Sequence, residues 1–314
     1  MEYVACDLCG ADDSEELFIG RDEWYGRSGT FPTVRCRQCG LIYVNPRPDP
    51  KTIGHYYPAD YAPYFLAVED EPSWWQRLNR RLALRKRLRL IQRHLPRPGR
   101  VLDVGCATGS FLVTLREAGW QVQGVEFNSQ AADYARRRHG LDVVTGTLAD
   151  GRFPDNQFDL VIFWDVLEHV HGPRQTLLEA ARITRPGGTL LLVLPNPDSL
   201  EATWFGSQWA GWDTPRHLYI YSRPVLHRFL SETGWQMGAT SCITGRIWLF
   251  NLSLAHWLQN RVKNSSVRRV IMTIMRSLPI RILSLPFFMT VERLQKGSVM
   301  AVFAHRIADH DHNN

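Results

Sequence analysis

The sequence predicts an α/β fold, in which a mostly parallel sheet is covered by helices on both faces. From residue 100 to residue 197, short apolar runs alternate with stretches of helical periodicity, and strands joined by crossover helices build a parallel sheet. The first apolar run ends in a glycine-containing turn that opens a helix. The 314 residues are 44% hydrophobic and 22% charged, which suits a globular core and excludes a collagen-like, fully disordered or small disulfide-stapled protein.

Five strands are predicted in this region, over residues 101–105, 121–127, 141–146, 158–166 and 189–197. The helices between them are predicted over residues 110–119, 131–140 and 174–184. After the fifth strand we expect a loop rich in Trp and Gly, a helix, a strand and, near the end, a last strand, over 201–217, 222–233, 235–242 and 298–305 respectively.

Four cysteines near the N-terminus form two knuckles, Cys6-x2-Cys9 and Cys36-x2-Cys39, each followed by Gly. Four thiolates at this spacing can close tetrahedrally on one zinc ion, and a site with four protein ligands is structural. The glycines suit the tight turns that such knuckles need. The alternative is a set of buried free cysteines. Cys106 and Cys242 have no partner motif and are expected in the core.

These signals divide the chain into five segments. They are a zinc-binding module (1–50), an aromatic linker with a basic amphipathic helix (51–98), a cofactor-binding core (99–245), a basic apolar helical insertion (246–296), and the last core strand with its tail (297–314).

The net charge of +6 is concentrated in two segments. Residues 73–100 carry ten Arg or Lys and no acid, and residues 246–296 carry nine with one Glu. Apolar residues with Trp and a basic polar face describe helices that lie on anionic lipid, and the alternative is a helical lid packed on the core. The sequence shows no signal peptide and no run of eighteen apolar residues, so we expect a cytoplasmic protein, and the two basic segments make the inner face of the membrane a candidate place of peripheral association.

The glycine turn after the first core strand, DVGCATG (103–109), lets a ligand lie against the backbone at a helix N-terminus. The second strand ends in Glu126, and an acid at this position can accept both hydroxyls of a ribose. The glycine spacing differs from that of a dinucleotide-binding GxGxxG fingerprint.

With DVGCATG, VEFN, FPDNQFDLVIFWDVLEHV and RPGGTLLLVLPNP in this order, the chain resembles class I S-adenosylmethionine (SAM)-dependent methyltransferases over residues 99–243. The resemblance implies a Rossmann-like sheet of seven strands whose last strand is inserted antiparallel. It also implies SAM as cofactor. Asp103, Gly105 and Gly109 would line its methionine end, Glu126 would hold the ribose, and Phe127 would lie beside the adenine. The full set of implied cofactor-binding residues is Asp103, Gly105, Cys106, Gly109, Glu126, Phe127, Thr147, Leu148 and Asp165.

The flanks, with CGLIYVNPRP and HYYPADY, resemble zinc-containing bacterial methyltransferases of sugar and surface-glycan pathways. In this group a motif after the fifth strand contains a histidine that is the proposed general base. His217 matches this histidine, and Tyr221 and Ser222 match the tyrosine and serine near the end of the same motif. The sequence departs from the group's motif at residues 214–216, where a tyrosine and a glutamate are replaced. The alternative for His217 is a capping or core histidine.

Other candidates have open roles. Glu168 and His169 follow the fourth strand, where a structural role is favoured over catalysis. Arg216 is a candidate for holding a substrate phosphate or carboxylate, or for a surface salt bridge. Tyr56, Tyr57 and Tyr61 are candidates for the wall of the acceptor pocket or for packing between domains.

The sequence therefore predicts methyl transfer from SAM to a sugar-type acceptor, either a nucleotide-sugar or a lipid-linked glycan precursor. The alternatives are O- or N-methylation of a lipid or secondary metabolite and, less favoured, action on nucleic acid, because the text between the cysteine knuckles is acidic.

Overall fold

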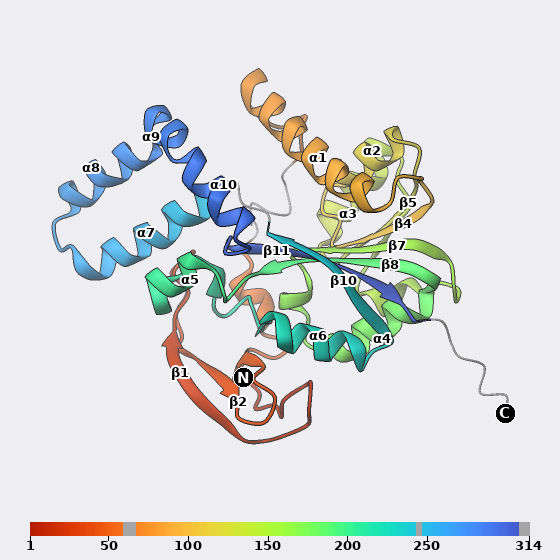
Figure 1. Cartoon of the computed structure of the whole chain (residues 1–314), viewed down its shortest axis with the longest axis horizontal. Helices are drawn as coiled ribbons and strands as arrows, with labels where there is room; N and C mark the ends of the chain where they lie inside the picture. The colour runs from red at the N-terminus through yellow and green to blue at the C-terminus, as the bar shows by residue number, and fades with distance from the viewer. Residues whose placement is uncertain (59–66, 243–246, 308–314) are drawn as a thin grey trace.

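The computed structural model describes residues 1–58, 67–242 and 247–307, and its centre is a seven-stranded sheet (Figure 1). The strand order is β10-β11-β8-β7-β4-β5-β6. Five of the strands, from β8 to β6 in this order, are parallel, and β11 runs antiparallel to both β8 and β10. The bounds are β4 Arg100–Val104, β5 Gln121–Glu126, β6 Val143–Thr145, β7 Phe158–Trp164, β8 Thr184–Pro195, β10 Trp235–Cys242 and β11 Val299–Arg306. The predicted α/β sheet with an antiparallel last strand is confirmed.

Helices cover both faces of this sheet (Figure 1). One face packs against the helices α1 (Trp74–His94), α2 (Ser110–Glu117) and α3 (Ser129–His139). The other face packs against α4 (Pro173–Ile183), α6 (Arg223–Ser231) and the N-terminal module. The inner strands β4, β7, β8 and β11 are mostly apolar and buried, as expected for a sheet covered on both sides.

The N-terminal segment forms a second, four-stranded sheet in the order β1-β2-β3-β9. Its first three strands are β1 Ser14–Gly20, β2 Phe31–Cys36 and β3 Ile42–Val44, whereas β9 is Tyr219–Ile220. Strand β9 pairs antiparallel with β3. In the chain it follows β8 of the central sheet and the segment after β8. The loop that ends at His217 is therefore held by the N-terminal module.

The segment after β8 contains more helix than the sequence predicts, and the insertion, predicted as helical, divides into several helices. The segment expected as a loop over 201–217 contains α5 (Leu200–Phe205), because the Ser199 side chain caps its first turn and Ala202 and Phe205 are buried. Over its described residues, 247–296, the insertion contains four helices, namely α7 (Ile247–Arg261), α8 (Ser265–Arg276), α9 (Leu278–Leu283) and α10 (Leu285–Arg293). Pro279 and Pro286 lie in the first turns of α9 and α10, where proline is tolerated and a longer helix is not continued.

The basic helix α1 contacts the core mainly through its C-terminal half. Ile91 is fully buried, and Leu84 and Leu88 pack against the core cluster that contains α2. At the other end Trp74, Leu78 and Leu82 are exposed. The apolar residues of the predicted amphipathic stripe thus have two different environments.

Candidate functional site

The turn between β4 and α2 has the geometry of a ligand cradle. Gly105 and Gly109 have φ near +77°, which is a left-handed conformation that favours glycine, and Gly109 is the N-cap of α2. A side chain at Gly105 would meet the Val166 methyl group at 2.5 Å. Ala107 has φ +48°, a left-handed backbone conformation that is energetically unfavourable for a residue other than glycine. The turn therefore brings bare backbone to the carboxyl edge of the sheet.

Glu126, at the end of β5, joins this turn to the next one. One oxygen accepts from the Ala107 amide at 2.8 Å and the other accepts from the Asn128 amide at 2.7 Å. The carboxyl group is buried, and burial raises its pKa. Each carboxylate oxygen has a second lone pair, so a fixed Glu126 can still accept one hydroxyl proton per oxygen. This is the arrangement that a vicinal diol such as a ribose requires.

Asp103 is buried on β4, and burial raises its pKa to about 7. The positive charge of Arg87, on α1, acts in the opposite direction. The Arg87 guanidinium lies 4.3 Å from the centroid of the Trp164 ring, so α1 contributes a cation to this end of the site. Arg87 could not be singled out from the sequence, because it is one of seven arginines in the basic helix α1 and nothing in the pattern distinguishes it.

The remaining candidate cofactor residues lie around the same edge in different environments. The Cys106 side chain is buried in the core, so only its backbone borders the turn. Phe127 is 70% exposed beside Glu126. Thr147 is exposed and Leu148 is buried, at a turn capped by Asp150. Asp165 follows β7 with φ +56°, which is strained for a non-glycine residue.

His217 lies next to two carboxyl groups. Its Nδ1 is 2.8 Å from the Gly211 carbonyl oxygen, which can only accept, so Nδ1 carries the proton and Nε2 has the free lone pair. Nε2 is 3.9 Å from an oxygen of Glu168 and 3.9 Å from an oxygen of Asp213. Burial lowers the pKa of His217 to about 4, so the ring is neutral near pH 7. A neutral imidazole with a free Nε2 is a proton acceptor.

Glu168 and His169 complete this cluster. Glu168 is 1% exposed, neither of its oxygens has a hydrogen-bond partner, and burial raises its pKa far above the usual range. The rings of His169 and His217 are 4.7 Å apart, and burial lowers the pKa of His169 to about 3. Ligand atoms of Glu168, His169 and His217 lie within 4.8 Å of one another, so this set could also hold a metal ion. Glu168 and His169, for which the sequence favours a structural role, both lie beside the candidate base His217.

A model of a methyltransferase domain matches residues 74–239, which is more than half of the chain. The chain belongs to this family. The match covers α1, the glycine turn, Glu126 and the histidine cluster, so the SAM-dependent methyltransferase activity expected of this domain is supported by the family and by the sheet order. SAM is thus the methyl donor, and the carboxyl edge described above is where a donor would bind.

Several known proteins are similar to the methyltransferase domain. An uncharacterized 37.1 kDa protein in transposon TN4556 of Streptomyces fradiae is 35% identical over 43% of this chain and 41% of its own length. A ubiquinone biosynthesis O-methyltransferase of Burkholderia pseudomallei is 28% identical over 48% of this chain and 71% of its own. The crystal structure of a putative sarcosine dimethylglycine methyltransferase from Galdieria sulphuraria has 15% identity and a TM-score of 0.48, over 78% of this chain and 91% of its own.

Arg216 does not have either of the roles predicted from the sequence. It is fully buried, and its guanidinium pairs with Asp213 at 2.5 Å and with Asp22 at 2.8 Å. It also donates to the Tyr56 carbonyl oxygen at 3.1 Å. Burial alone would raise the pKa of Asp22, but the hydrogen bond and charge of Arg216 hold it below its usual value. Arg216 is neither a surface salt bridge nor a free anion site, because the N-terminal module covers it.

The tyrosines predicted to line the acceptor pocket or to pack between domains have different environments. The Tyr57 hydroxyl is 3.0 Å from Nδ1 of His169, so it reaches the histidine cluster of the methyltransferase domain. The Tyr56 hydroxyl donates to the Ser28 carbonyl oxygen and its ring packs against Phe31, inside the N-terminal module. Tyr61 lies outside the described residues.

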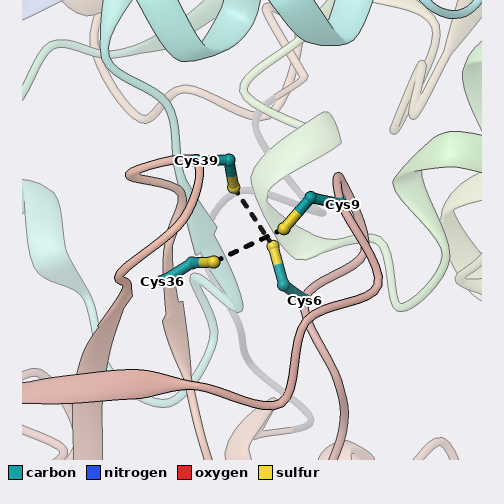
Figure 2. A group of neighbouring side chains, drawn as sticks. All are labelled: Cys6, Cys9, Cys36 and Cys39. Atoms are coloured by element: carbon teal, nitrogen blue, oxygen red, sulfur yellow. Dashed lines mark hydrogen bonds between the residues drawn. The ribbon is translucent and has the colours of Figure 1, made fainter.

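The four knuckle cysteines converge on one point (Figure 2). The Sγ atoms of Cys6 and Cys39 are 3.4 Å apart, and those of Cys9 and Cys36 are 3.5 Å apart. Sulfurs around a tetrahedral zinc at about 2.3 Å are about 3.8 Å apart, so small outward shifts would admit the ion. No disulfide joins these cysteines. Gly10 and Gly40 have φ of +74° and +79°, as the knuckle turns require. The donor set thus fits a structural zinc.

A cleft of about 260 Å³ lies between the N-terminal module, the 207–214 segment and α7. Trp24 and Trp212 contribute aromatic surface, and Asp213 links this cleft to His217. The other lining residues include a set of polar side chains, namely Arg21, Glu23, Ser207, Gln208, Thr214, His256 and Asn260.

Proposed function

We propose that this chain transfers a methyl group from SAM to a sugar-type acceptor, either a nucleotide-sugar or a lipid-linked glycan precursor. The observation that carries the proposal is the cleft beside His217, where Trp24 and Trp212 lie among polar side chains. Aromatic faces with a few hydrogen-bonding groups suit a ligand that is hydroxylated at its edges and apolar on its ring faces.

The protein has mainly to position the methyl donor, the acceptor and a proton-accepting group relative to one another. SAM supplies a methyl group that is already activated on a sulfonium. Glu126 would hold the ribose, and Asp103 would face the amino group of the methionine end. The positive charge of that amino group, like the charge of Arg87, would favour the ionised form of Asp103, whose pKa burial raises to about 7. His217 would take the proton of the acceptor on Nε2, while its Nδ1 proton stays bonded to Gly211. The proton taken up on Nε2 would lie near Glu168 and Asp213, each of which has an oxygen 3.9 Å from this nitrogen.

A second candidate is O-methylation of a lipid or secondary metabolite. It is favoured by the named relatives, which include the ubiquinone biosynthesis enzyme and a fatty-acid O-methyltransferase of Mycolicibacterium smegmatis, 40% identical over 31% of this chain and 38% of its own. Nucleic acid is the least supported acceptor.

The acceptor class is tested with methyl-labelled SAM and a bacterial extract separated into aqueous and lipid phases. We expect label in a sugar, released either as a water-soluble nucleotide-sugar or, after mild acid, from the lipid phase. Label in a lipid that contains no sugar would replace the proposal with the second candidate. Label covalently incorporated into nucleic acid, by a reaction that weakens steeply as salt is added to the assay, would replace it with a nucleic-acid acceptor.

We also propose that Cys6, Cys9, Cys36 and Cys39 hold a structural zinc ion. The proposal is supported by the convergence of the four sulfurs and by the left-handed backbone of the glycine that ends each knuckle. We expect one zinc per chain by elemental analysis, and Cys36→Ser to lower it to near zero, because a three-sulfur site binds the ion far more weakly. Cys242→Ala, which removes a buried cysteine outside the cluster, is the control and should keep the zinc. Equal zinc contents in the two variants would contradict the assignment.

A further inference from the structure

The helices α8, α9 and α10 expose a dense set of large apolar side chains. Neither α8 nor α9 buries a single residue, whereas α10 is anchored by Phe288 and Val291. The exposed residues, which we call the apolar surface, are Val267, Val270, Ile274, Leu278, Ile282, Leu283, Leu285, Phe287, Met289 and Leu294, with exposed fractions from 42% to 75%. A patch of this kind marks an interaction site.

The pattern along α8 separates apolar from basic side chains. Val267, Val270 and Ile274 recur at helical spacing on one side. Arg269 and Arg276 each follow a residue of this stripe by two positions, so they lie on the other side of the helix, and both are exposed. Long arginine side chains on that side can keep their charge in water while the apolar stripe is buried. A helix with these two sides lies in the plane of a membrane interface.

Among the described residues, no single helix has the length and hydropathy needed to cross a membrane. Only α8 taken together with residues 278–293 meets these criteria, and this pair is bent by 57°. Arg276 and Arg281 stand on either side of the bend. Two charges at the middle of a span are costly in hydrocarbon, whereas they are favourable at an interface.

The charge of the segment discriminates between possible partners. Residues 261–296 contain eight Arg or Lys and one acid, Glu292. Two copies of this chain that met through the apolar surface would bring like charges together. An anionic lipid surface instead supplies both the apolar layer and the opposite charge.

We propose that α8–α10 bind this protein peripherally to an anionic membrane. The exposed Trp74 and Trp75 at the start of α1 fit the same role, because tryptophan is enriched at membrane interfaces, and α1 and α9 project from the same side of the molecule in Figure 1. The Leu200 amide donates to the Lys296 carbonyl oxygen at 3.1 Å, which attaches the end of this segment to the chain leaving β8, at the carboxyl edge of the sheet. The membrane-bound surface and the catalytic edge are thus adjacent.

The test is co-sedimentation of the full chain with vesicles of phosphatidylcholine, with or without about one third phosphatidylglycerol. We expect binding only to the anionic vesicles and release by salt. Each basic residue near such a surface contributes about 1 kcal/mol, so Arg269→Gln with Arg276→Gln should weaken partitioning about thirty-fold. The control is Arg137→Gln with Arg138→Gln, an equal charge change on the exposed side of α3, which should leave binding intact.

The apolar part is tested by Val270→Asp with Ile274→Asp, against Leu178→Asp on α4 as control, because all three side chains are exposed in the folded chain. Loss of vesicle binding only in the α8 variant is expected. Equal weakening by both arginine pairs, equal binding to neutral vesicles, or a dimer that the α8 variant dissociates would each overturn the proposal. Binding is measured without methyl transfer, so a wrong acceptor assignment would leave this result unaffected.

Discussion

Replacing His217 with Asn is expected to lower kcat by about 10² to 10⁴-fold while SAM affinity is kept, which is the usual contribution of a general base. The asparagine amide can still donate to the Gly211 carbonyl oxygen, as Nδ1 does now at 2.8 Å, so the loop keeps its contact. What the variant lacks is the free nitrogen that faces Glu168 and Asp213. The measurement is single-turnover methyl transfer together with SAM binding by calorimetry.

The pH profile gives a second measure of the same role. The base acts when it is neutral, and burial lowers the pKa of His217 to about 4. The activity should therefore persist as the pH falls below 6.5, where an ordinary histidine becomes protonated, and should decrease only as the pH approaches 4. The acid limb should disappear in His217→Asn.

Glu126→Ala is the matched control, because it removes the carboxylate that would bind the ribose and should weaken SAM binding instead of the chemical step. Full activity of His217→Asn would return this histidine to a structural role. An acid limb near pH 6.5 in the wild-type enzyme would show that a more exposed group is the base.

Replacing Arg216 with Met is expected to lower the free energy of unfolding by about 3–5 kcal/mol, the cost of breaking a buried ion pair. The side chain is fully buried, and its removal would leave the carboxylates of Asp22 and Asp213 facing each other without their shared partner. We would measure denaturant unfolding of the zinc-loaded chain, and limited proteolysis of the N-terminal module.

Arg228→Met provides the comparison, because the Arg228–Glu232 pair lies on the surface of α6 with both side chains partly exposed. An exposed pair contributes about 0–1 kcal/mol. Similar losses in the two variants would mean that the Arg216 pairs do not hold the module on the core.

The central sheet could be predicted from the sequence because its evidence is local. Each strand is a short apolar run that ends at a turn residue, and the turn after the first of them is recognisable in the sequence from Gly105 and Gly109. The knuckle cysteines are identified by spacing in the same way, and the structure brings all four together.

The histidine cluster and Arg216 could not be predicted because their partners come from distant segments. Glu168 and His217 are 49 positions apart in the sequence. They are brought together by tertiary contacts, among them the pairing of β9 with β3 and the hydrogen bond from the Leu218 amide to the Glu168 carbonyl oxygen at 2.8 Å. In the sequence Arg216 follows Asp213, Thr214 and Pro215, and a polar, proline-containing stretch of this kind suggests an exposed position. Its burial results from Asp22, almost two hundred positions earlier, folding over it.

The shared sheet of β3 and β9 also limits how this protein can be recombined. A chimera that exchanged residues 1–50 for the corresponding part of a relative would have to supply both an edge that fits Tyr219–Ile220 and an acid in place of Asp22. The N-terminal module and the loop that carries His217 must therefore be exchanged together, although Asp22 and Arg216 are almost two hundred positions apart in the sequence.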